Sequence, residues 1–401
     1  MKRLQAFKFQ LITTPSKEKK LLRYVGCSRF VYNKALTAQI ERIEKGESRN
    51  GFASLCKTLT DWRHSEENSF LAEAPTHPLQ QSLKDLERAF VNFRAGRAGF
   101  PRFKKRGSGD AIRYPDAKQI RLDEKNNRIF LPKLGWTRYG NSRAVQGEVK
   151  NVTVKISNGK WFMSIQTERE VEEPLATGRP VGIDVGIVRF ATLSDGSVIE
   201  PLNSFRKHEA VLKKAQRKLS RKRKFSKNWR KARALVQRIH ARIANVRKDF
   251  LHRQSTTICK SHAIVCVEKL QVGNMSRSAA GSMEEPGKNV RAKSGLNKSI
   301  LDQRWYEFRR QLEYKLTWKG GLLVTVPPQN TSRTCPACSC VAAENRLSQA
   351  EFRCKDCGFE ENADKVGAIN ILRAGLAQLA CQANEDTRRQ QEPSVSAVLT
   401  A

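Results

Sequence analysis

The chain has 401 residues and carries 75 Lys and Arg against 39 Asp and Glu, a formal net charge of +36. This surplus exceeds what solubility requires and predicts a polyanionic partner, with nucleic acid preferred over an anionic membrane surface. The sequence excludes a membrane-spanning protein, because no run approaches the roughly 18 apolar residues that a spanning helix needs. The basic N-terminus lacks the apolar core of a signal peptide. Ten cysteines in a chain of this length are too few for a disulfide scaffold, which favours a reducing compartment.

The first half of the chain predicts a strand, a helical block and then further strands. Residues 3–12 alternate apolar and polar side chains, as a strand does, and Thr14-Pro15 is a typical helix start. Apolar residues then recur at helical spacing through residues 16–97, with breaks near 46–51 and 75–78. A basic loop with interleaved aromatics, GFPRFKKRGSG, follows. Residues 111–170 predict short strands, with a hairpin turn at Asn158-Gly159.

The second half predicts buried strands separated by helices. VGIDVGIVRFATLSDGSVIE, from residue 181, reads as two strands joined by a Ser-Asp-Gly turn, and residues 263–270 form another apolar strand. Residues 272–299 are rich in Gly, Ser and Lys and predict a mobile loop. A helix through Leu301 and Trp305 and a strand in GLLVTVPP come next. The final residues, 382–401, predict a disordered tail.

Two Cys-x-x-Cys pairs separated by fifteen residues stand near the C-terminus. They supply Cys335, Cys338, Cys354 and Cys357. Four thiolates at this spacing are typical of a zinc ribbon, and because they fill all four positions of a tetrahedral ion, the predicted zinc is structural rather than catalytic. The alternative is that these cysteines merely occupy a protein core.

Three carboxylates lie in unusual contexts. Asp184 falls within a predicted strand, Glu268 ends another, and Asp364 stands near a helix start directly behind the second cysteine pair. Each has an ordinary alternative: a turn or capping role, a salt bridge to a nearby basic group such as Lys269, and an N-terminal cap. Together, in so basic a chain, they match a two-metal nuclease that binds Mg²⁺ or Mn²⁺. One ion would activate water and the other would stabilise the leaving 3′ oxygen.

Residues 206–248 hold eighteen Lys and Arg against one acid, Glu209. Narrow apolar stripes predict a helical hairpin with its turn near 222–228 and a strongly basic remainder. The alternative is a solvated face, but self-repulsion on this scale favours contact with nucleic acid. Phe225 and Trp229 could stack on bases or pack within the protein. The predicted contact residues are Lys213, Lys214, Arg217, Arg221, Lys222, Arg223, Lys224, Arg230 and Lys231, with Arg102, Lys104 and Lys105 in the earlier basic loop.

Across nearly its whole length the chain resembles TnpB-type proteins, which are transposon-encoded RNA-guided DNA nucleases related to type V CRISPR effectors. SRFVYNKAL resembles their N-terminal helical signature, and GFPRFKKR a basic loop. GIDVGIVRFATLSDG, IVCVEKLQVGNM and NADKVGAINIL resemble the three RuvC-like blocks, and TSRTCPAC with FRCKDCGF the zinc ribbon. Asp184, Glu268 and Asp364 take the family's catalytic positions. Asn362, Ala363 and Val366 depart from residues that are common in the third block.

The resemblance implies a mixed α/β fold in two parts. An OB-like wedge barrel (1–14 and 105–178) would be split by a helical recognition domain (15–104). A RuvC-like ribonuclease-H domain (179–330 and 362–381) would include the basic hairpin (206–255) and carry the inserted zinc ribbon (331–361).

The resemblance also implies the function. The protein would be an RNA-guided DNA endonuclease that uses Mg²⁺ or Mn²⁺ for catalysis and Zn²⁺ for structure. A guide RNA from the transposon end and target double-stranded DNA would be its partners, in a ribonucleoprotein with one protein copy in the prokaryotic cytoplasm or nucleoid. Two alternatives remain: a non-cleaving RNA-guided DNA-binding regulator, which should lack an acid, and a transposase that joins DNA strands without a guide.

Overall fold

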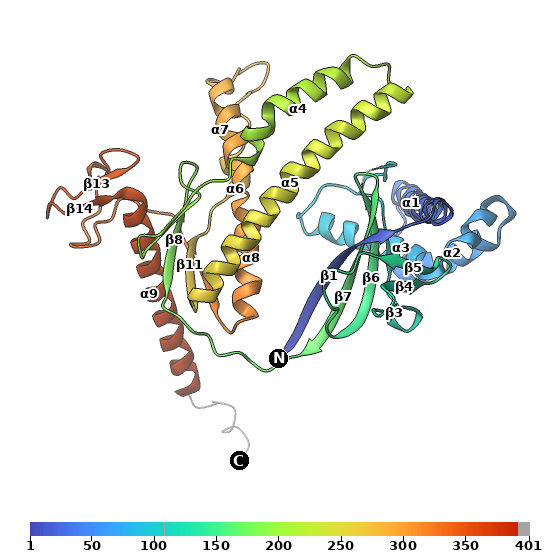
Figure 1. The fold of residues 1–401 in the computed structure, drawn as a ribbon, viewed down its shortest axis with the longest axis horizontal. Coiled ribbons are helices and arrows are strands. Elements are labelled where there is room, and N and C mark those ends of the chain that lie inside the picture. Colours follow the sequence, from blue (N-terminus) through green and yellow to red (C-terminus); the bar gives the residue numbers. More distant parts are fainter. Residues whose placement is uncertain (108, 392–401) are drawn as a thin grey trace. The chain divides into compact units, whose positions relative to one another are not determined.

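The computed structural model describes residues 1–107 and 109–391, and side chains as far as residue 384. The chain divides into two compact units, residues 1–172 and 173–401, which are described separately below (Figure 1). No helix in the described residues is long and apolar enough to cross a membrane.

The first unit is built on an antiparallel sheet with the strand order β2-β6-β7-β1-β5-β4-β3. β1 pairs with β7 over residues 2–10, and its last residues, Leu11 and Ile12, pair with β5. Among the described residues the two edge strands, β2 and β3, do not pair with each other, so the sheet is open and a closed OB-like barrel remains a prediction. The strands are β1 (Lys2–Ile12), β2 (Ala111–Tyr114), β3 (Arg121–Asp123), β4 (Arg128–Leu131), β5 (Gly135–Tyr139), β6 (Glu148–Ser157) and β7 (Lys160–Glu170).

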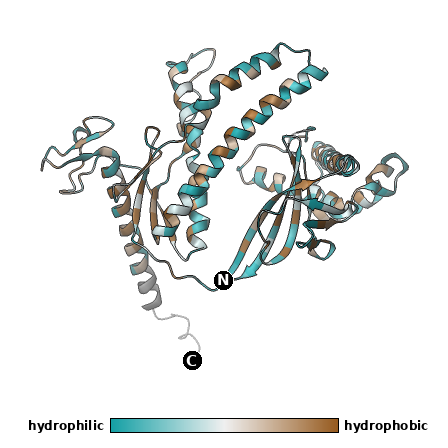
Figure 2. Cartoon of the chain, viewed as in Figure 1, coloured by the Kyte–Doolittle hydropathy of each residue, from teal (hydrophilic) through white to brown (hydrophobic). Residues whose placement is uncertain are grey.

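Alternating side chains give this sheet one buried face. In β1, Phe7, Phe9 and Leu11 are buried while the residues between them are exposed, and β7 alternates in the same way. Hydrophobic and hydrophilic residues are correspondingly interleaved along β1, β6 and β7 (Figure 2). This period of two is what a strand with one solvated face requires.

Helices inserted between β1 and β2, with a short 3₁₀ segment between β2 and β3, complete the first unit. The long helix α1 begins at Pro15, and the Thr14 side chain accepts a hydrogen bond from the Lys17 N–H, so the predicted start is confirmed. The predicted breaks are also present, since the next helices start at Phe52 and Thr76. The helices are α1 (Pro15–Glu44), α2 (Phe52–His64), the 3₁₀ segments η1 (Glu66–Glu73) and η2 (Ala117–Gln119), and α3 (Thr76–Arg94).

The second unit contains a mixed sheet with the order β10-β9-β8-β11-β12. β8, β11 and β12 run parallel, and β9 and β10 form an antiparallel edge. The stretch predicted as two strands is three, because the chain breaks between β8 and β9; the Ser-Asp-Gly turn then joins β9 to β10. The strands are β8 (Val181–Val185), β9 (Ala191–Leu193), β10 (Val198–Ile199), β11 (Ile264–Glu268) and β12 (Leu322–Val326).

Helices and a small ribbon surround this sheet. α4 and α5 form the predicted hairpin, and the ribbon strands β13 (Glu351–Arg353) and β14 (Glu360–Asn362) pair antiparallel. The short 3₁₀ segment η3 (Ala343–Asn345) precedes them. The helices are α4 (Ser204–Ser220), α5 (Lys227–Ser261), α6 (Val272–Met275), α7 (Val290–Gln303), α8 (Trp305–Thr317) and α9 (Ala363–Gln391).

Two further segments differ from their predictions. Within the loop expected over residues 272–299, residues 272–275 form the short helix α6, and residues 290–299 form most of α7, because Ile300 is buried and anchors that helix. Residues 382–391, expected to be disordered, continue α9, whose Ala-, Leu- and Gln-rich sequence favours a helix. The rest of the predicted tail, residues 392–401, lies outside the described residues.

Candidate active site and metal centre

Two of the three predicted acids lie side by side at the carboxyl ends of parallel strands. β8 pairs with β11 in the register Val265↔Val181, Cys266↔Gly182 and Val267↔Ile183. Continuing this register by one residue sets Glu268 beside Asp184. Both carboxylates are half-buried, whereas the residues that precede them are buried in the sheet. Loops and helix starts meet at this edge of a parallel sheet, where ligands of open α/β folds usually bind.

The third acid reaches this edge on α9, which begins directly after the last ribbon strand. β14 ends at Asn362, and Asp364 lies in the first turn of α9. The helix packs closely on β8: a Cβ placed on Gly182 would come within 3.0 Å of the Ala368 carbonyl oxygen, and one on Gly367 would stand 3.0 Å from Oδ2 of Asp184. Glycine is therefore what allows this approach, and the approach brings Asp364 near Asp184.

The electrostatics of Asp184 follow from this convergence. Burial, followed by the negative charges of Glu268 and Asp364, raises the pKa of Asp184 to about 7. Arg346 and the Val185 backbone N–H act in the opposite direction. Burial also raises the pKa of Glu268, and a hydrogen bond from Thr331 partly offsets that effect. A buried carboxylate whose ionisation is disfavoured by neighbouring acids, as Asp184 is here, is typical of a site that takes a cation.

Two residues missed at the sequence level contact the acids. Nη2 of Arg346, from the ribbon, lies 4.0 Å from Oδ1 of Asp364. The Thr331 hydroxyl donates to Oε1 of Glu268 at 2.6 Å, and the Thr331 carbonyl accepts a hydrogen bond from Asn370 of α9 at 2.8 Å. Neither residue belongs to a spacing pattern: Thr331 opens the TSRTCPAC segment, whereas Arg346 lies between the two cysteine pairs, outside every motif.

Asn362, Ala363 and Val366, which differ from the residues common in the third RuvC-like block, have structural roles. Asn362 Oδ1 accepts hydrogen bonds from the Asp364 N–H, at 3.2 Å, and from Nη1 of Arg189, at 3.2 Å. Asn362 therefore caps the start of α9 and ties it to the loop after β8. Ala363 and Val366 are fully buried in the small core beneath the ribbon.

The four predicted cysteines lie together. Within the described residues theirs is the one group of His, Cys, Asp and Glu ligand atoms close enough to share an ion, with all four within 4.8 Å of one another. Sγ of Cys335 is 3.6 Å from Sγ of Cys357, and Sγ of Cys338 is 3.5 Å from Sγ of Cys354. Thiolates that bind a tetrahedral zinc at about 2.3 Å lie about 3.8 Å apart, so the spacing fits zinc. The carboxylate oxygens of the three acids form no such tight group in the described chain.

Both cysteine pairs use the same local geometry. After Cys338 the chain turns at Ser339 with φ 63°, and after Cys357 it turns at Gly358 with φ 74°. In each turn that residue's N–H donates to the carbonyl of the first cysteine of its pair, at 3.0 Å. Backbone N–H groups of Cys357 and Asp356, partly offset by burial, help to lower the pKa of Cys354 to about 6, which favours the thiolate that a metal needs.

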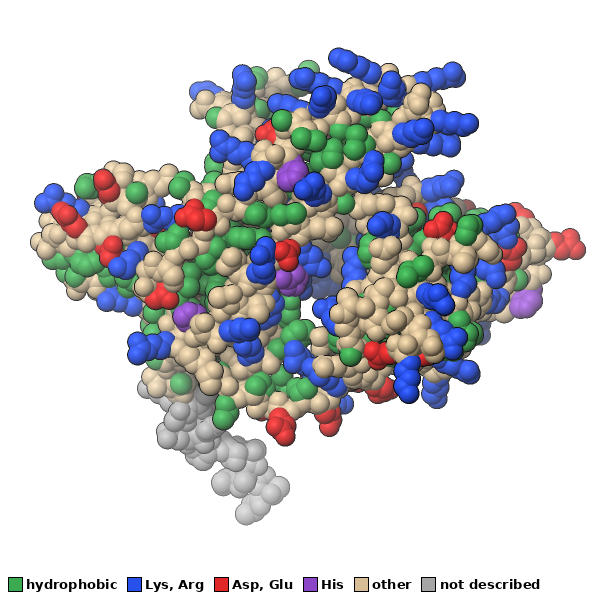
Figure 3. All heavy atoms as spheres, viewed as in Figure 1, with side chains coloured by type: hydrophobic (Ala, Val, Ile, Leu, Met, Phe, Trp, Pro, Cys, Tyr) green, Lys and Arg blue, Asp and Glu red, His purple; other side chains and the backbone are tan. Residues whose placement is uncertain are grey.

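The predicted nucleic-acid contacts of the hairpin lie on its outer surface. Lys222 is half-buried and the other predicted cations of α4, α5 and their turn are exposed; in the part of the chain that the structure describes, none forms a salt bridge with an acid. Figure 3 shows Lys and Arg side chains gathered around the outer end of this hairpin. Unneutralised cations on a protruding element are suited to contact phosphates.

The earlier basic loop, in the first unit, is less uniform. Arg102 and Lys105 are exposed, whereas Lys104 is held in place: its Nζ lies 3.3 Å from Oδ2 of Asp85 and 4.1 Å from the centre of the Tyr32 ring. Lys104 is thus the least available of these three cations for a phosphate.

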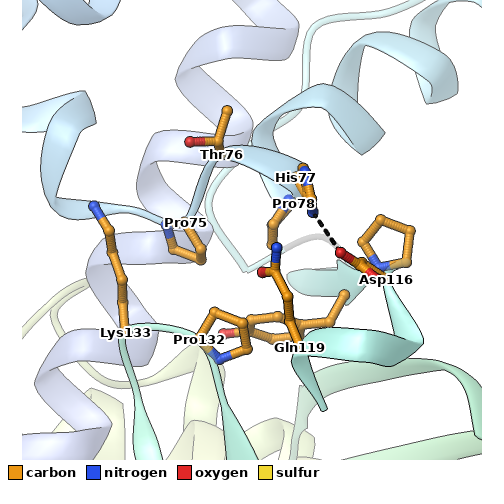
Figure 4. A pocket seen from close by; sticks show the side chains of 10 residues that line it. Pro75, Thr76, His77, Pro78, Asp116, Gln119, Pro132 and Lys133 are labelled. Atoms are coloured by element: carbon orange, nitrogen blue, oxygen red, sulfur yellow. Dashed lines mark ion pairs between the residues drawn. The ribbon is translucent and has the colours of Figure 1, made fainter.

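A pocket of about 210 Å³ opens elsewhere in the first unit, beside the start of α3 (Figure 4). Its walls include Pro75, Pro78 and Pro132, and Nδ1 of His77 lies 3.8 Å from Oδ2 of Asp116. Asp116 is the single carboxylate of the lining. The paired acids that metal-dependent hydrolysis requires are therefore found at the β8–β11 edge and not in this pocket.

Comparison with known proteins identifies the family. A family model described as "Probable transposase", of the IS605 OrfB family, matches residues 163–279, a "Cas12f1-like, TNB domain" model matches 305–371, and a "Helix-turn-helix domain" model matches 1–48. The chain is 54% identical, over the full length of both proteins, to the "Putative RNA-guided DNA endonuclease InsQ" of Escherichia coli K12. This chain belongs to the TnpB family.

A second relative and a solved structure are also similar to this chain. A Streptomyces pristinaespiralis protein, "Putative RNA-guided DNA endonuclease", is 36% identical to this TnpB-family chain over 97% of it and 93% of the relative. The solved structure "Cryo-EM structure of the Cas12f1-sgRNA-target DNA complex" matches with a TM-score of 0.52 at 13% identity, covering 92% of this chain and 98% of that one. At this identity the match shows a common mixed α/β fold and nothing finer.

Proposed function

We propose that this TnpB-family protein is an RNA-guided, divalent-metal-dependent DNA endonuclease, encoded by a transposon, that cuts DNA beside a short flanking motif. The observation that carries the proposal is the convergence of Asp184, Glu268 and Asp364 at one edge of the second unit's sheet, where burial and then the charges of the other two acids raise the pKa of Asp184. The names of its close relatives support the same activity.

The acids suit Mg²⁺ or Mn²⁺. Carboxylates are the hard oxygen ligands that these ions prefer, and a bound cation would offset both the burial of Asp184 and the nearby negative charges that raise its pKa. Bound divalent ions would supply Lewis-acid stabilisation of the phosphate and a more acidic water. The ribbon cysteines, with soft thiolate ligands and no carboxylate among them, suit a structural Zn²⁺.

The chain's own residues have distinct roles in this proposal. Asp184, Glu268 and Asp364 would hold the ions. Thr331 donates to Glu268 and so fixes the orientation of that carboxylate. Arg346 brings a positive charge to the same edge from the ribbon, where it offsets the acids and can attract the scissile phosphate. The ribbon thereby supplies both a scaffold for Asp364 and a charged group for the site.

The proposed partners are a guide RNA made from the transposon end and target double-stranded DNA, in a ribonucleoprotein with one protein copy. Guide–target pairing would choose the sequence, while the protein reads the flanking motif. The unpaired cations of the α4–α5 hairpin support binding of a polyanion but do not distinguish RNA from DNA. The first unit would act as wedge barrel and recognition domain, and the second as nuclease and zinc ribbon.

One experiment tests the function directly. RNA that co-purifies with the protein is sequenced, and the complex is then incubated with Mg²⁺ and a DNA library in which the target flank is randomised. We expect one defined RNA scaffold, and cleavage only beside particular flanks. Bulk tRNA and rRNA together with no cleavage would overturn the proposal.

A strand-transferring transposase is the second candidate, because the matched IS605 OrfB family model is described as a probable transposase. It predicts joining of transposon ends to new DNA without RNA. Recovery of joined products from ribonuclease-treated protein would favour it. The non-cleaving regulator has no observation in its favour, since all three acids are present.

A further inference from the structure

The turn at the tip of the basic hairpin places an aromatic residue where backbone geometry favours glycine. The Ser226 N–H donates to the Arg223 carbonyl at 3.2 Å and closes a four-residue turn between α4 and α5. Phe225 occupies the third position of this turn with φ 67°. A positive φ at that position normally selects Gly or Asn, because a larger side chain crowds the backbone.

Phe225 gains little burial in return for this conformation. Its side chain is 72% exposed. Among the described residues its ring contacts that of Trp229, in the first turn of α5, with ring centroids 5.5 Å apart and planes tilted by 52°. The Arg233 guanidinium covers Trp229 from within α5, 5.3 Å from the ring centroid. Burial of the Phe225 side chain therefore does not compensate for the strain of its backbone conformation.

A cationic groove leads to this tip. It is an open hollow of about 700 Å³ along α4, lined by Ala210 and six cations: Lys213, Lys214, Arg217, Lys218, Arg221 and Lys222. These cations form two rows at i, i+4 spacing, so successive charges in a row rise by about 6 Å along the helix. The groove ends three residues before Phe225.

We propose that the α4 groove and Phe225 form one binding site for an unpaired stretch of nucleic acid, in which the groove holds phosphates and the Phe225 ring stacks on a base. The charge of the groove selects a polyanion, and the exposed ring selects one whose bases are free to stack. The same chemistry is offered by an unpaired segment of RNA and by a displaced DNA strand. The inference rests on the proposed nucleic-acid binding but not on cleavage.

A local structural role is the main competitor. A hydrophobic residue just before a helix N-cap can pack on the first turn of that helix, and Ser226 is the N-cap of α5, with its side chain accepting from the Trp229 N–H at 3.1 Å. If Phe225 served only that contact, replacing it would lower stability and leave binding unchanged. Because the position has a positive φ, one substitution can separate a role in stability from a role in binding.

Phe225→Asn is the decisive variant, because Asn tolerates positive φ and cannot stack as an aromatic ring does. Full-length protein freed of nucleic acid is titrated into a labelled single-stranded oligonucleotide and a blunt duplex of the same length, each as RNA and as DNA. The thermal midpoint is measured on the same samples. Phe225→Tyr keeps a ring, and Phe225→Leu keeps apolar bulk without one.

We expect Phe225→Asn to unfold at the same temperature or higher, and to bind single strands roughly 5- to 100-fold more weakly, the loss of about one stacked base. Phe225→Tyr should retain affinity, Phe225→Leu should not, and duplex binding should change little. Comparison of the affinities for RNA and for DNA oligonucleotides then shows which kind of strand the site binds.

The proposal is overturned if the Phe225→Asn variant is less stable but binds single strands normally, or if the Phe225→Leu variant binds as well as the wild type. It is equally overturned if the wild type prefers duplexes or if the substitution alters the oligomeric state. Normal guide-dependent cleavage alongside any of these results would leave the nuclease assignment standing.

Discussion

Gly367 of α9 faces the carboxylate of Asp184 so closely that a Cβ added to it would stand 3.0 Å from Oδ2. The helix that carries the third acid therefore rests directly on the first acid. This contact links the ribbon, which ends where α9 begins, to the edge of the sheet that carries Asp184 and Glu268.

Glycine substitutions should test this packing. Gly182→Ala would place a methyl group within 3.0 Å of the backbone of Ala368, which cannot yield cheaply; we expect a loss of about 1–3 kcal/mol in stability and little cleavage. Gly367→Ala meets a side chain that can shift, so the fold should persist with slower cleavage. Thermal unfolding and cleavage rates measure both. Gly26→Ala, in α1 with nothing within 4 Å, is the control and should stabilise the protein. Equal behaviour of all three variants would contradict the packing.

Asp184→Ala should abolish cleavage and leave nucleic-acid binding intact, because the residue holds charge at the site and contributes little to the surface that binds a polyanion. We expect a rate loss on the order of 10³-fold or more, equivalent to several kcal/mol of transition-state stabilisation. Gel-shift assays with guide RNA and target DNA provide the binding control. A variant that still cuts at the wild-type rate would show that the active site lies elsewhere.

The metal requirement should depend on pH. The folded-state pKa of Asp184 is about 7, above its ordinary value of 3.8, so below pH 7 a cation must displace a proton. We expect the Mg²⁺ concentration for half-maximal cleavage to rise up to about tenfold for each pH unit below 7. A requirement that is constant between pH 6 and 8 would contradict this titration.

The same shift affects stability without metal. A carboxyl group with a raised folded-state pKa stabilises the fold fully below pH 3.8, and this contribution is lost as pH rises through about 7. In chelator, the wild type should therefore lose thermal stability between about pH 4 and pH 7 relative to Asp184→Asn, which cannot titrate, and the difference should level off above pH 7. Parallel curves for the two proteins would count against the assignment.

Cys354→Ser should remove the ribbon's metal and, through β14, misplace Asp364. We expect zinc content to fall from about one ion per chain to near zero, with loss of cleavage. Elemental analysis and cleavage assays measure these effects. Cys381→Ser removes an exposed thiol outside the tetrad and should change neither. Full zinc content in the Cys354→Ser variant would contradict the proposed four-cysteine zinc site.

Arg346→Ala should slow cleavage by roughly 10- to 1000-fold, because it removes the positive charge beside Asp364. It should also raise the pKa of Asp184 further, since Arg346 acts to lower it, and so shift the pH dependence of the metal requirement upward. Arg353→Ala is the matched control, as Arg353 belongs to the same ribbon but pairs with the exposed Glu360. An unchanged pH profile in Arg346→Ala would exclude the electrostatic role.

The amino-acid sequence alone determined the parts whose signals are local. Alternation marked β1, Thr14-Pro15 marked the start of α1, and the spacing of the cysteines marked their cluster, because each of these depends on neighbours along the chain. The strand positions of Asp184 and Glu268 were also predictable, since apolar runs precede both acids.

Only the tertiary structure decided what depends on contacts between distant residues. The closeness of the three acids follows from the β8–β11 register and the packing of α9. The roles of Arg346, Thr331 and Asn362 follow from hydrogen bonds and ion pairs to residues that cannot be predicted from spacing along the chain. α7 is a helix because the side chain of Ile300 is buried in the protein core, and the composition of the segment does not predict that burial. The backbone angle of Phe225 arises from the turn that joins two helices, so its strain became visible only in three dimensions.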